Sequence, residues 1–86
     1  MKLYPTKDFI ECYESLPQWI QKQADKQLGL LLQNLHHSSL RVKKIKGVKN
    51  IWEARVTKGY RFSFGIKDDT YILRRIGKHE EVLRRP

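Results

Sequence analysis

The chain has 86 residues, of which 40% are apolar and 31% charged, and its formal net charge is +9. This size allows one domain with one modest core. The single cysteine, Cys12, excludes an internal disulfide, no Cys/His spacing is typical of a zinc site, and no apolar run is long enough to span a membrane. We therefore expect a protein of the reducing cytoplasm, without a metal, a small-molecule cofactor or a membrane partner.

The first 39 residues favour a short strand and two helices. Lys2–Tyr4 is a candidate strand, and Thr6 is a suitable N-cap for a helix over residues 7–15. Pro17 separates this helix from a second one over residues 18–35, because the residue before a proline rarely stays helical. The second helix has apolar residues mostly three and four positions apart, which predicts one buried stripe. The stripe consists of Ile20, Ala24, Leu28, Leu31, Leu32 and Leu35.

After residue 39 the period of the apolar residues changes from 3.6 to 2, which predicts strands. Residues 40–45 alternate in this way, and strands are expected over residues 51–56, 60–66 and 70–76. Gly59 fits the left-handed position of a three-residue hairpin loop. With the first strand, these segments predict an α+β fold of order β-α-α-β-β-β. A helical hairpin should cover one face of a curved, mainly antiparallel four-stranded sheet.

Positive charge is concentrated in the strand-forming part of the chain. Residues 40–86 hold 14 Lys or Arg against 5 Asp or Glu, whereas residues 1–39 hold 4 against 4. A folded basic surface of this kind favours a partner with a phosphate backbone. The cations that we expect to bind RNA are Lys43, Lys44, Lys46, Arg74, Arg75 and Lys78.

The polar face of the predicted sheet carries candidate catalytic residues, and we expect it to face solvent. The hairpin places Arg55 opposite Arg61, and a phosphodiester between the two guanidinium groups would satisfy both. RNA cleavage without a metal needs a base for the 2′-OH, cations for the phosphorane and an acid for the leaving 5′-oxygen. Glu53 on this face is the candidate base. His79, just after Gly77 breaks the last strand, is the candidate acid, and these two roles are exchangeable.

Other reactive or aromatic residues are interpreted as structural. His36 and His37 follow the second helix, where an imidazole interacts favourably with the helix dipole. Trp19 neighbours the apolar stripe and is expected to pack in the core or between the helices. Cys12 has no visible base beside it, so a nucleophilic role is not expected.

The chain resembles the RelE/ParE superfamily of bacterial toxins over nearly its whole length. The resemblance rests on the element order and on four short segments: residues 43–47 (KKIKG), 52–56 (WEARV), 59–64 (GYRFSF) and 76–83 (IGKHEEVL). It implies one RelE-like toxin domain over residues 1–86, located in the bacterial cytoplasm and neutralised by a cognate antitoxin. It also implies ribosome-dependent mRNA cleavage without a metal, as in members similar to RelE and YoeB.

The resemblance also implies individual roles. By position, Arg61 corresponds to the arginine that stabilises the reacting phosphate. Arg55 corresponds to a basic residue of the preceding strand, and His79 corresponds to the catalytic histidine of YoeB. RelE has a lysine where this chain has Glu53, and its C-terminal catalytic tyrosine has no counterpart after His79. These departures favour YoeB-like chemistry with a carboxylate and a histidine. The glutamate of YoeB lies in an earlier segment, nearer residues 43–44, so the base assignment stays open.

Two other functions remain open at this point. A ParE-like inhibitor of DNA gyrase would bind its target without cutting nucleic acid. A plain nucleic-acid-binding domain, or a toxin that has lost its activity, would also carry a basic surface. The combination of Arg61 with Glu53 and His79 favours the nuclease, because a pure inhibitor needs no proton donor on its basic face.

Overall fold

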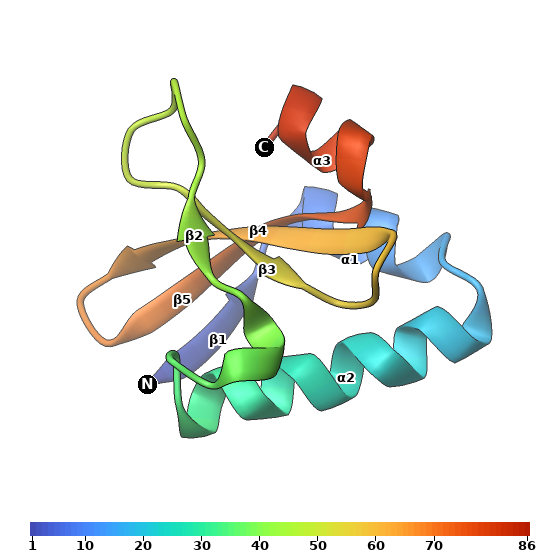
Figure 1. The fold of residues 1–86 in the computed structure, drawn as a ribbon, viewed down its shortest axis with the longest axis horizontal. Helices are drawn as coiled ribbons and strands as arrows, with labels where there is room; N and C mark the ends of the chain where they lie inside the picture. Colours follow the sequence, from blue (N-terminus) through green and yellow to red (C-terminus); the bar gives the residue numbers. More distant parts are fainter.

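The computed structural model describes residues 1–86 as five strands, three α-helices and a short 3-10 helix. The elements are β1 (Lys2–Pro5), α1 (Lys7–Glu14), α2 (Gln18–Gln33), η1 (Ser38–Leu40), β2 (Lys43–Lys44), β3 (Trp52–Arg55), β4 (Tyr60–Lys67), β5 (Thr70–Lys78) and α3 (His79–Arg84). The strands form one sheet in the order β1-β5-β4-β3-β2, in which only β1 and β5 are parallel (Figure 1). No helix combines the length and the apolar character that crossing a membrane requires.

The predicted α+β class and helical hairpin are confirmed, but the sheet has five strands instead of four. The additional strand, β2, comes from the alternating segment at residues 40–45. Leu40 is fully buried in η1, and Arg41 follows it with a left-handed backbone (φ 47°). This change of direction leaves only Lys43 and Lys44 to pair with β3.

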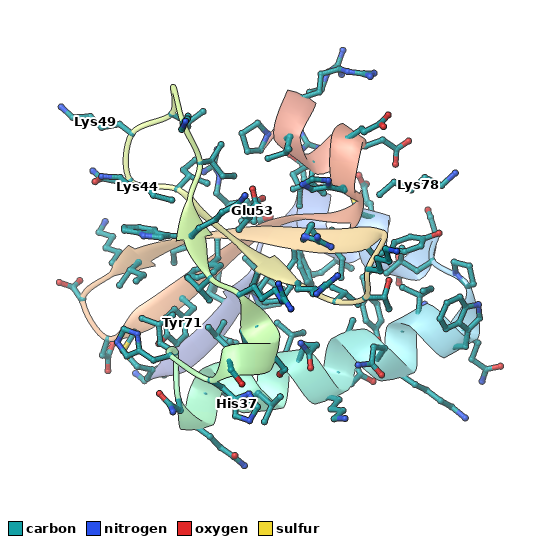
Figure 2. The ribbon with its side chains drawn as sticks, in the orientation of Figure 1. His37, Lys44, Lys49, Glu53, Tyr71 and Lys78 are labelled. Atoms are coloured by element: carbon teal, nitrogen blue, oxygen red, sulfur yellow. The ribbon has the colours of Figure 1, made fainter.

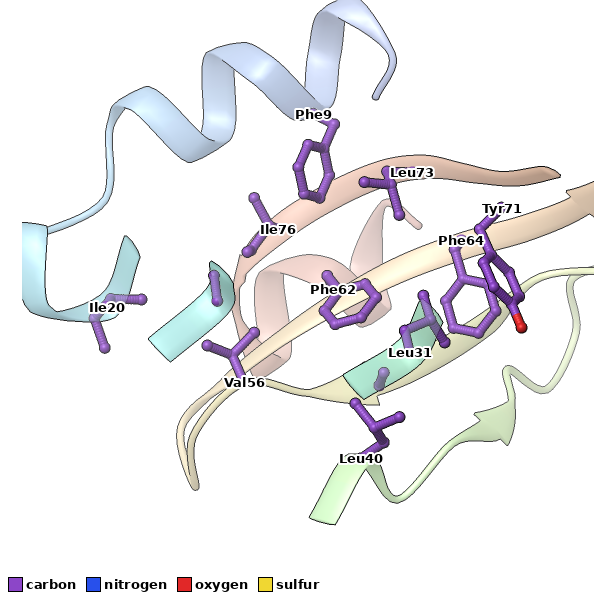
Figure 3. Packing of buried hydrophobic residues seen from close by; sticks show 12 residues of the cluster. Phe9, Ile20, Leu31, Leu40, Val56, Phe62, Phe64, Tyr71, Leu73 and Ile76 are labelled. Carbon is purple, nitrogen blue, oxygen red and sulfur yellow. The ribbon is translucent and has the colours of Figure 1, made fainter. Parts of the chain in front are cut away.

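The core lies between the sheet and the two long helices (Figure 3). Phe62 and Phe64 of β4 are fully buried there, and Tyr71 of β5 meets Phe64 edge-on with the ring centres 5.6 Å apart. The helices contribute Phe9, Ile20, Ala24 and Leu31. The expectation for Trp19 was wrong. Its side chain is 66% exposed because the neighbouring Ile20 takes the core-facing position of α2.

Thr6 begins α1 as predicted. Its hydroxyl oxygen accepts a hydrogen bond from the backbone N–H of Phe9 at 3.2 Å. The Thr6→Ala variant is expected to lose about 1 kcal/mol of unfolding free energy, because a helix donor then lacks its partner. Urea denaturation measures this loss, with Thr6→Ser as the control that keeps the hydroxyl. Equal stability of Thr6→Ala and wild type would show that the cap contributes nothing.

The third helix covers the other face of the sheet, opposite α2 (Figure 1). Val82 of α3 is buried, and the hydroxyl of Ser63 donates to the Pro86 carbonyl at 3.0 Å. The expectation that this face is open to solvent was therefore wrong, since Glu53 is only 3% exposed. The physical reason is α3, which follows β5 directly and packs over this face. Gly77 pairs with Arg61 inside β5 and does not end the strand.

The β3–β4 hairpin also differs in detail from its prediction. Gly59 does not have a positive φ. The left-handed positions lie at Gly47 and at three residues with side chains: Arg41, Asn50 and Asp68. The loop instead closes through the backbone N–H of Val56, which donates to the carbonyl of Tyr60 at 2.9 Å.

Candidate functional site

Strand register brings the predicted polar residues together on the side of the sheet that faces α3. Arg55 lies directly opposite Arg61, as predicted, and Glu53 lies opposite both Ser63 of β4 and Lys43 of β2. Alternate residues of a strand point to the same face, so Glu53 and Arg55 share the α3 side. Figure 2 shows Glu53 on β3 below α3.

The carboxylate of Glu53 lies between a guanidinium group and an imidazole. Its Oε1 is 3.7 Å from Arg61 Nε and 3.7 Å from His79 Nε2. Glu53 is almost fully buried, whereas 15% of the Arg61 side chain and 40% of the His79 side chain are exposed. Three of the four predicted catalytic residues thus meet at one carboxylate oxygen, with solvent access from the histidine side.

The hairpin loop holds the guanidinium group of Arg61 in place. Its Nη1 donates to the carbonyl oxygens of Thr57 at 2.6 Å, Lys58 at 3.0 Å and Tyr60 at 3.0 Å. Burial lowers the pKa of Arg61 from its ordinary value, the nearby charge of Arg55 lowers it further, and Glu53 acts in the opposite direction. An arginine keeps its charge at neutral pH in spite of such shifts. Arg61 is therefore a fixed cation.

Arg55 contributes an unused donor to the same face. Its Nε atom is buried and has no hydrogen-bond partner in the protein. Buried donors without a partner are rare and costly, and a site for an anion is one physical explanation.

Arg41 belongs to the same group of cations and was not predicted. Its positive charge is the smallest of the causes that act on the pKa of Arg61, and it lowers that pKa. A left-handed backbone is unusual for arginine, because the Cβ atom crowds the following carbonyl. In the sequence Arg41 looks like one more polar residue of an alternating strand, so only the three-dimensional structure identifies it.

Comparison with known proteins identifies the fold of this chain. No family model matches the chain, and no curated protein matches it by sequence. Among solved structures, it is similar to a chain of the RelB–RelE antitoxin–toxin complex from Methanococcus jannaschii. The two are 25% identical with a TM-score of 0.71, over 94% of this chain and 95% of that one.

A YoeB/ParE toxin from Agrobacterium tumefaciens is 16% identical with a TM-score of 0.78, over 92% of this chain and 99% of that one. The chain has the RelE/ParE toxin fold. A chain of the intact RelBE toxin–antitoxin complex from E. coli matches with 18% identity and a TM-score of 0.70, over 88% of this chain and 93% of that one. The predicted resemblance is thus confirmed at the level of the fold.

Within this RelE/ParE fold, a buried amide fixes the strand and the loop that carry two of the arginines. Gln27 of α2 is 3% exposed, and its Nε2 donates to the carbonyl of Arg55 at 2.8 Å and to that of Ser39 at 3.3 Å. Ser39 lies two residues before Arg41. The period of α2 does not identify Gln27, since a polar residue on that stripe looks like an interruption.

The Gln27→Ala variant is expected to lose about 2 kcal/mol of unfolding free energy, because two carbonyl groups are left without their donor. Thermal and urea denaturation measure the loss. Gln23→Ala, a change at a half-buried position one helical turn earlier, is the matched control. A loss in Gln27→Ala no larger than in the control would contradict the bridging role.

The predicted RNA-binding lysines surround the Glu53 site on two sides of α3. Lys43, Lys44 and Lys46 line a groove of about 320 Å³ that has Glu53 in its wall. Lys78 lies at the other end, in a groove of about 590 Å³ that includes His79 (Figure 2). The first groove reaches Glu53 itself, and the second reaches His79, which lies beside the Glu53 carboxylate.

The structure does not bring Arg74 and Arg75 to this site. The Nε of Arg74 donates to the Pro86 carbonyl at 3.1 Å, and Arg75 Nη2 lies 3.5 Å from Asp8 Oδ2. Both contacts are near α1 and the C-terminus. The role of these two arginines in RNA binding stays a prediction.

The two loop histidines do not join the site either. His37 Nδ1 accepts a hydrogen bond from the backbone N–H of Ser39 at 3.2 Å and caps η1, and His36 is exposed in the same loop. No group of three or more His, Cys, Asp or Glu side chains lies close enough together to hold a metal ion.

Proposed function

We propose that this protein is the toxin of a type II toxin–antitoxin pair and cleaves mRNA on the ribosome. The observation that carries the proposal is the approach of Arg61 and His79 to one oxygen of Glu53, each at 3.7 Å. A fixed cation, a carboxylate and an imidazole are the groups that metal-independent RNA cleavage requires. The RelE/ParE fold supports the toxin part of the proposal.

The proposed reaction is attack by the ribose on its own phosphate. Glu53 takes the proton of the 2′-OH, and the 2′-oxygen forms a bond to phosphorus. The bond from phosphorus to the 5′-oxygen breaks, and His79 gives that oxygen a proton. The products are a 2′,3′-cyclic phosphate and a 5′-hydroxyl. Arg55 and Arg61 stabilise the negative charge that develops on the phosphorane oxygens.

The RNA partners follow from the basic surface. The groove lined by Glu53 carries Lys43, Lys44 and Lys46, and the groove lined by His79 carries Lys58, Lys78 and Arg84. Lysines placed this way bind phosphates without reading sequence, which suits a protein that contacts ribosomal RNA and messenger RNA together. This proposal locates the protein in the bacterial cytoplasm, where the ribosomes are.

The proposed protein partner is a cognate antitoxin. Two of the structures with this fold are complexes of an antitoxin with a toxin. An acidic or amphipathic segment of such a partner would complement the net charge of +9. Binding over the grooves beside α3 would keep RNA away from Glu53.

Two assays run in parallel test the proposed function. Purified protein is added to a reconstituted translation reaction, and mRNA ends are mapped by primer extension. The same preparation is added to a gyrase supercoiling assay. The expected result is cleavage within the codon in the ribosomal A site with supercoiling unchanged. Inhibited supercoiling with intact mRNA would indicate a ParE-like inhibitor, and RNA binding without either effect would indicate a plain binding domain.

A further inference from the structure

A third basic groove lies at the edge strand β2, on the side of the sheet that carries α2. Its volume of about 500 Å³ is within the range of sites that hold one small ligand. No carboxylate lines it. Its basic and aromatic side chains are those of His36, His37, Arg41, Lys43, Lys44 and Trp52.

Trp52 offers an aromatic surface in this groove. The residue is half-buried, and its ring stacks on the buried Phe64 with 6.2 Å between ring centres and 23° between the planes. The ammonium group of Lys44, an exposed residue, lies 5.9 Å from the centre of the indole (Figure 2 labels Lys44). Lys44 makes no ion pair or side-chain hydrogen bond, so it is free to move when a flat ligand stacks on the indole.

The groove shares two lining lysines with the groove at Glu53, which lies across β2. Lys43 pairs with Glu53 and faces the α3 side, whereas Lys44 pairs with Trp52 and faces the α2 side. Both lysines line the groove at Trp52 and the groove at Glu53. Arg41 also lines the groove at Trp52, and its charge acts on Arg61. A single polyanion passing over this two-residue edge strand would contact both places.

We infer that the groove at Trp52 binds a nucleotide of the RNA strand that flanks the scissile linkage. Its base stacks on the indole of Trp52, and its phosphates lie among Lys43, Lys44 and Arg41. This inference rests on the proposed function and adds a subsite to it. Stacking on an aromatic ring tolerates every base, so the subsite adds affinity without sequence preference.

The fluorescence of Trp52 reports stacking directly. The chain has two tryptophans, and Trp19→Phe leaves Trp52 as the only one. This variant is titrated with a 2′-O-methyl RNA pentamer, which cannot be cleaved because the nucleophilic hydroxyl is blocked. Saturable quenching is expected. An abasic pentamer carries the same phosphates without bases and is expected to bind more weakly and to quench little.

Affinity measurements complement the quenching. Trp52→Ala is expected to weaken binding of the pentamer about 10-fold, since stacking of one base is lost. Trp52→Phe keeps an aromatic ring and is expected to bind almost as wild type does. Trp19→Ala, at an exposed tryptophan of α2, is the matched control and should bind as wild type. If Trp52→Ala does not fold, the quenching experiment decides, because it keeps Trp52.

Two results would overturn the inference. The first is that the abasic pentamer or poly-glutamate quenches the fluorescence of Trp52 as much as the RNA pentamer does. The second is that folded Trp52→Ala binds the RNA pentamer with wild-type affinity. Poly-glutamate imitates an acidic protein segment, so it tests whether the groove binds such a segment instead of a nucleotide. The ribosome assay distinguishes this failure from failure of the proposed function. Cleavage without quenching rejects only the subsite, and quenching without cleavage rejects only the nuclease.

Discussion

Arg61→Ala is expected to reduce the rate of mRNA cleavage on the ribosome by about 100- to 1,000-fold, the usual effect of removing one preorganised donor to a developing negative charge. The loop carbonyls of Thr57, Lys58 and Tyr60 fix this guanidinium group before RNA arrives. No reorganisation of the group is therefore needed during the reaction. Single-turnover cleavage with ribosomes in excess measures the effect on the chemical step.

Two further variants make the Arg61 experiment specific. Arg61→Lys keeps a positive charge but loses the planar fork and is expected to recover only part of the rate. Arg74→Ala removes a cation that contacts the Pro86 carbonyl and makes no ion pair with Glu53, and it is expected to cleave at the wild-type rate. Circular dichroism establishes that each variant is folded. Wild-type cleavage by folded Arg61→Ala would contradict the assigned site.

Glu53→Gln and His79→Gln are each expected to slow cleavage by about 100-fold or more, because each removes one partner of the proton transfers. The changes keep the size of the side chain, so packing below α3 is little affected. The rate is measured in the same single-turnover assay. Two folded variants that both cleave at the wild-type rate would exclude general acid–base catalysis by this pair.

A modified substrate assigns the base and the acid. An mRNA with sulfur in place of the scissile 5′-oxygen has a leaving group that needs no proton. If His79 is the acid, His79→Gln recovers on this substrate and Glu53→Gln does not. The opposite pattern would exchange the two roles, which the distances of 3.7 Å on either side of Glu53 Oε1 equally allow.

Local patterns in the sequence were sufficient to predict the pairing of the two strand arginines. The period of 2 and the hairpin fixed Arg55 opposite Arg61, and the structure has that register. Thr6 was identified as a helix cap for a similar reason, since its effect depends on the next three residues. These features depend on neighbours in the sequence or across one hairpin.

Features that depend on distant parts of the chain were not predicted. The burial of Glu53 results from α3, which folds back from the end of β5, and the sequence gives no signal for that direction. Arg41 joins the site through a left-handed backbone after the buried Leu40. Trp19 was expected to be buried because it neighbours an apolar stripe, but the structure leaves it exposed.

The chemistry of the cut ends tests most directly whether Arg61, His79 and Glu53 act on a phosphodiester. The mRNA is cleaved on the ribosome by wild-type protein, and both new ends are identified by mass spectrometry. A 2′,3′-cyclic phosphate with a 5′-hydroxyl is expected, and a single 2′-deoxyribose at the scissile position should abolish the cut. A 5′-phosphate with a 3′-hydroxyl, or cleavage that persists at the 2′-deoxyribose, would contradict the mechanism.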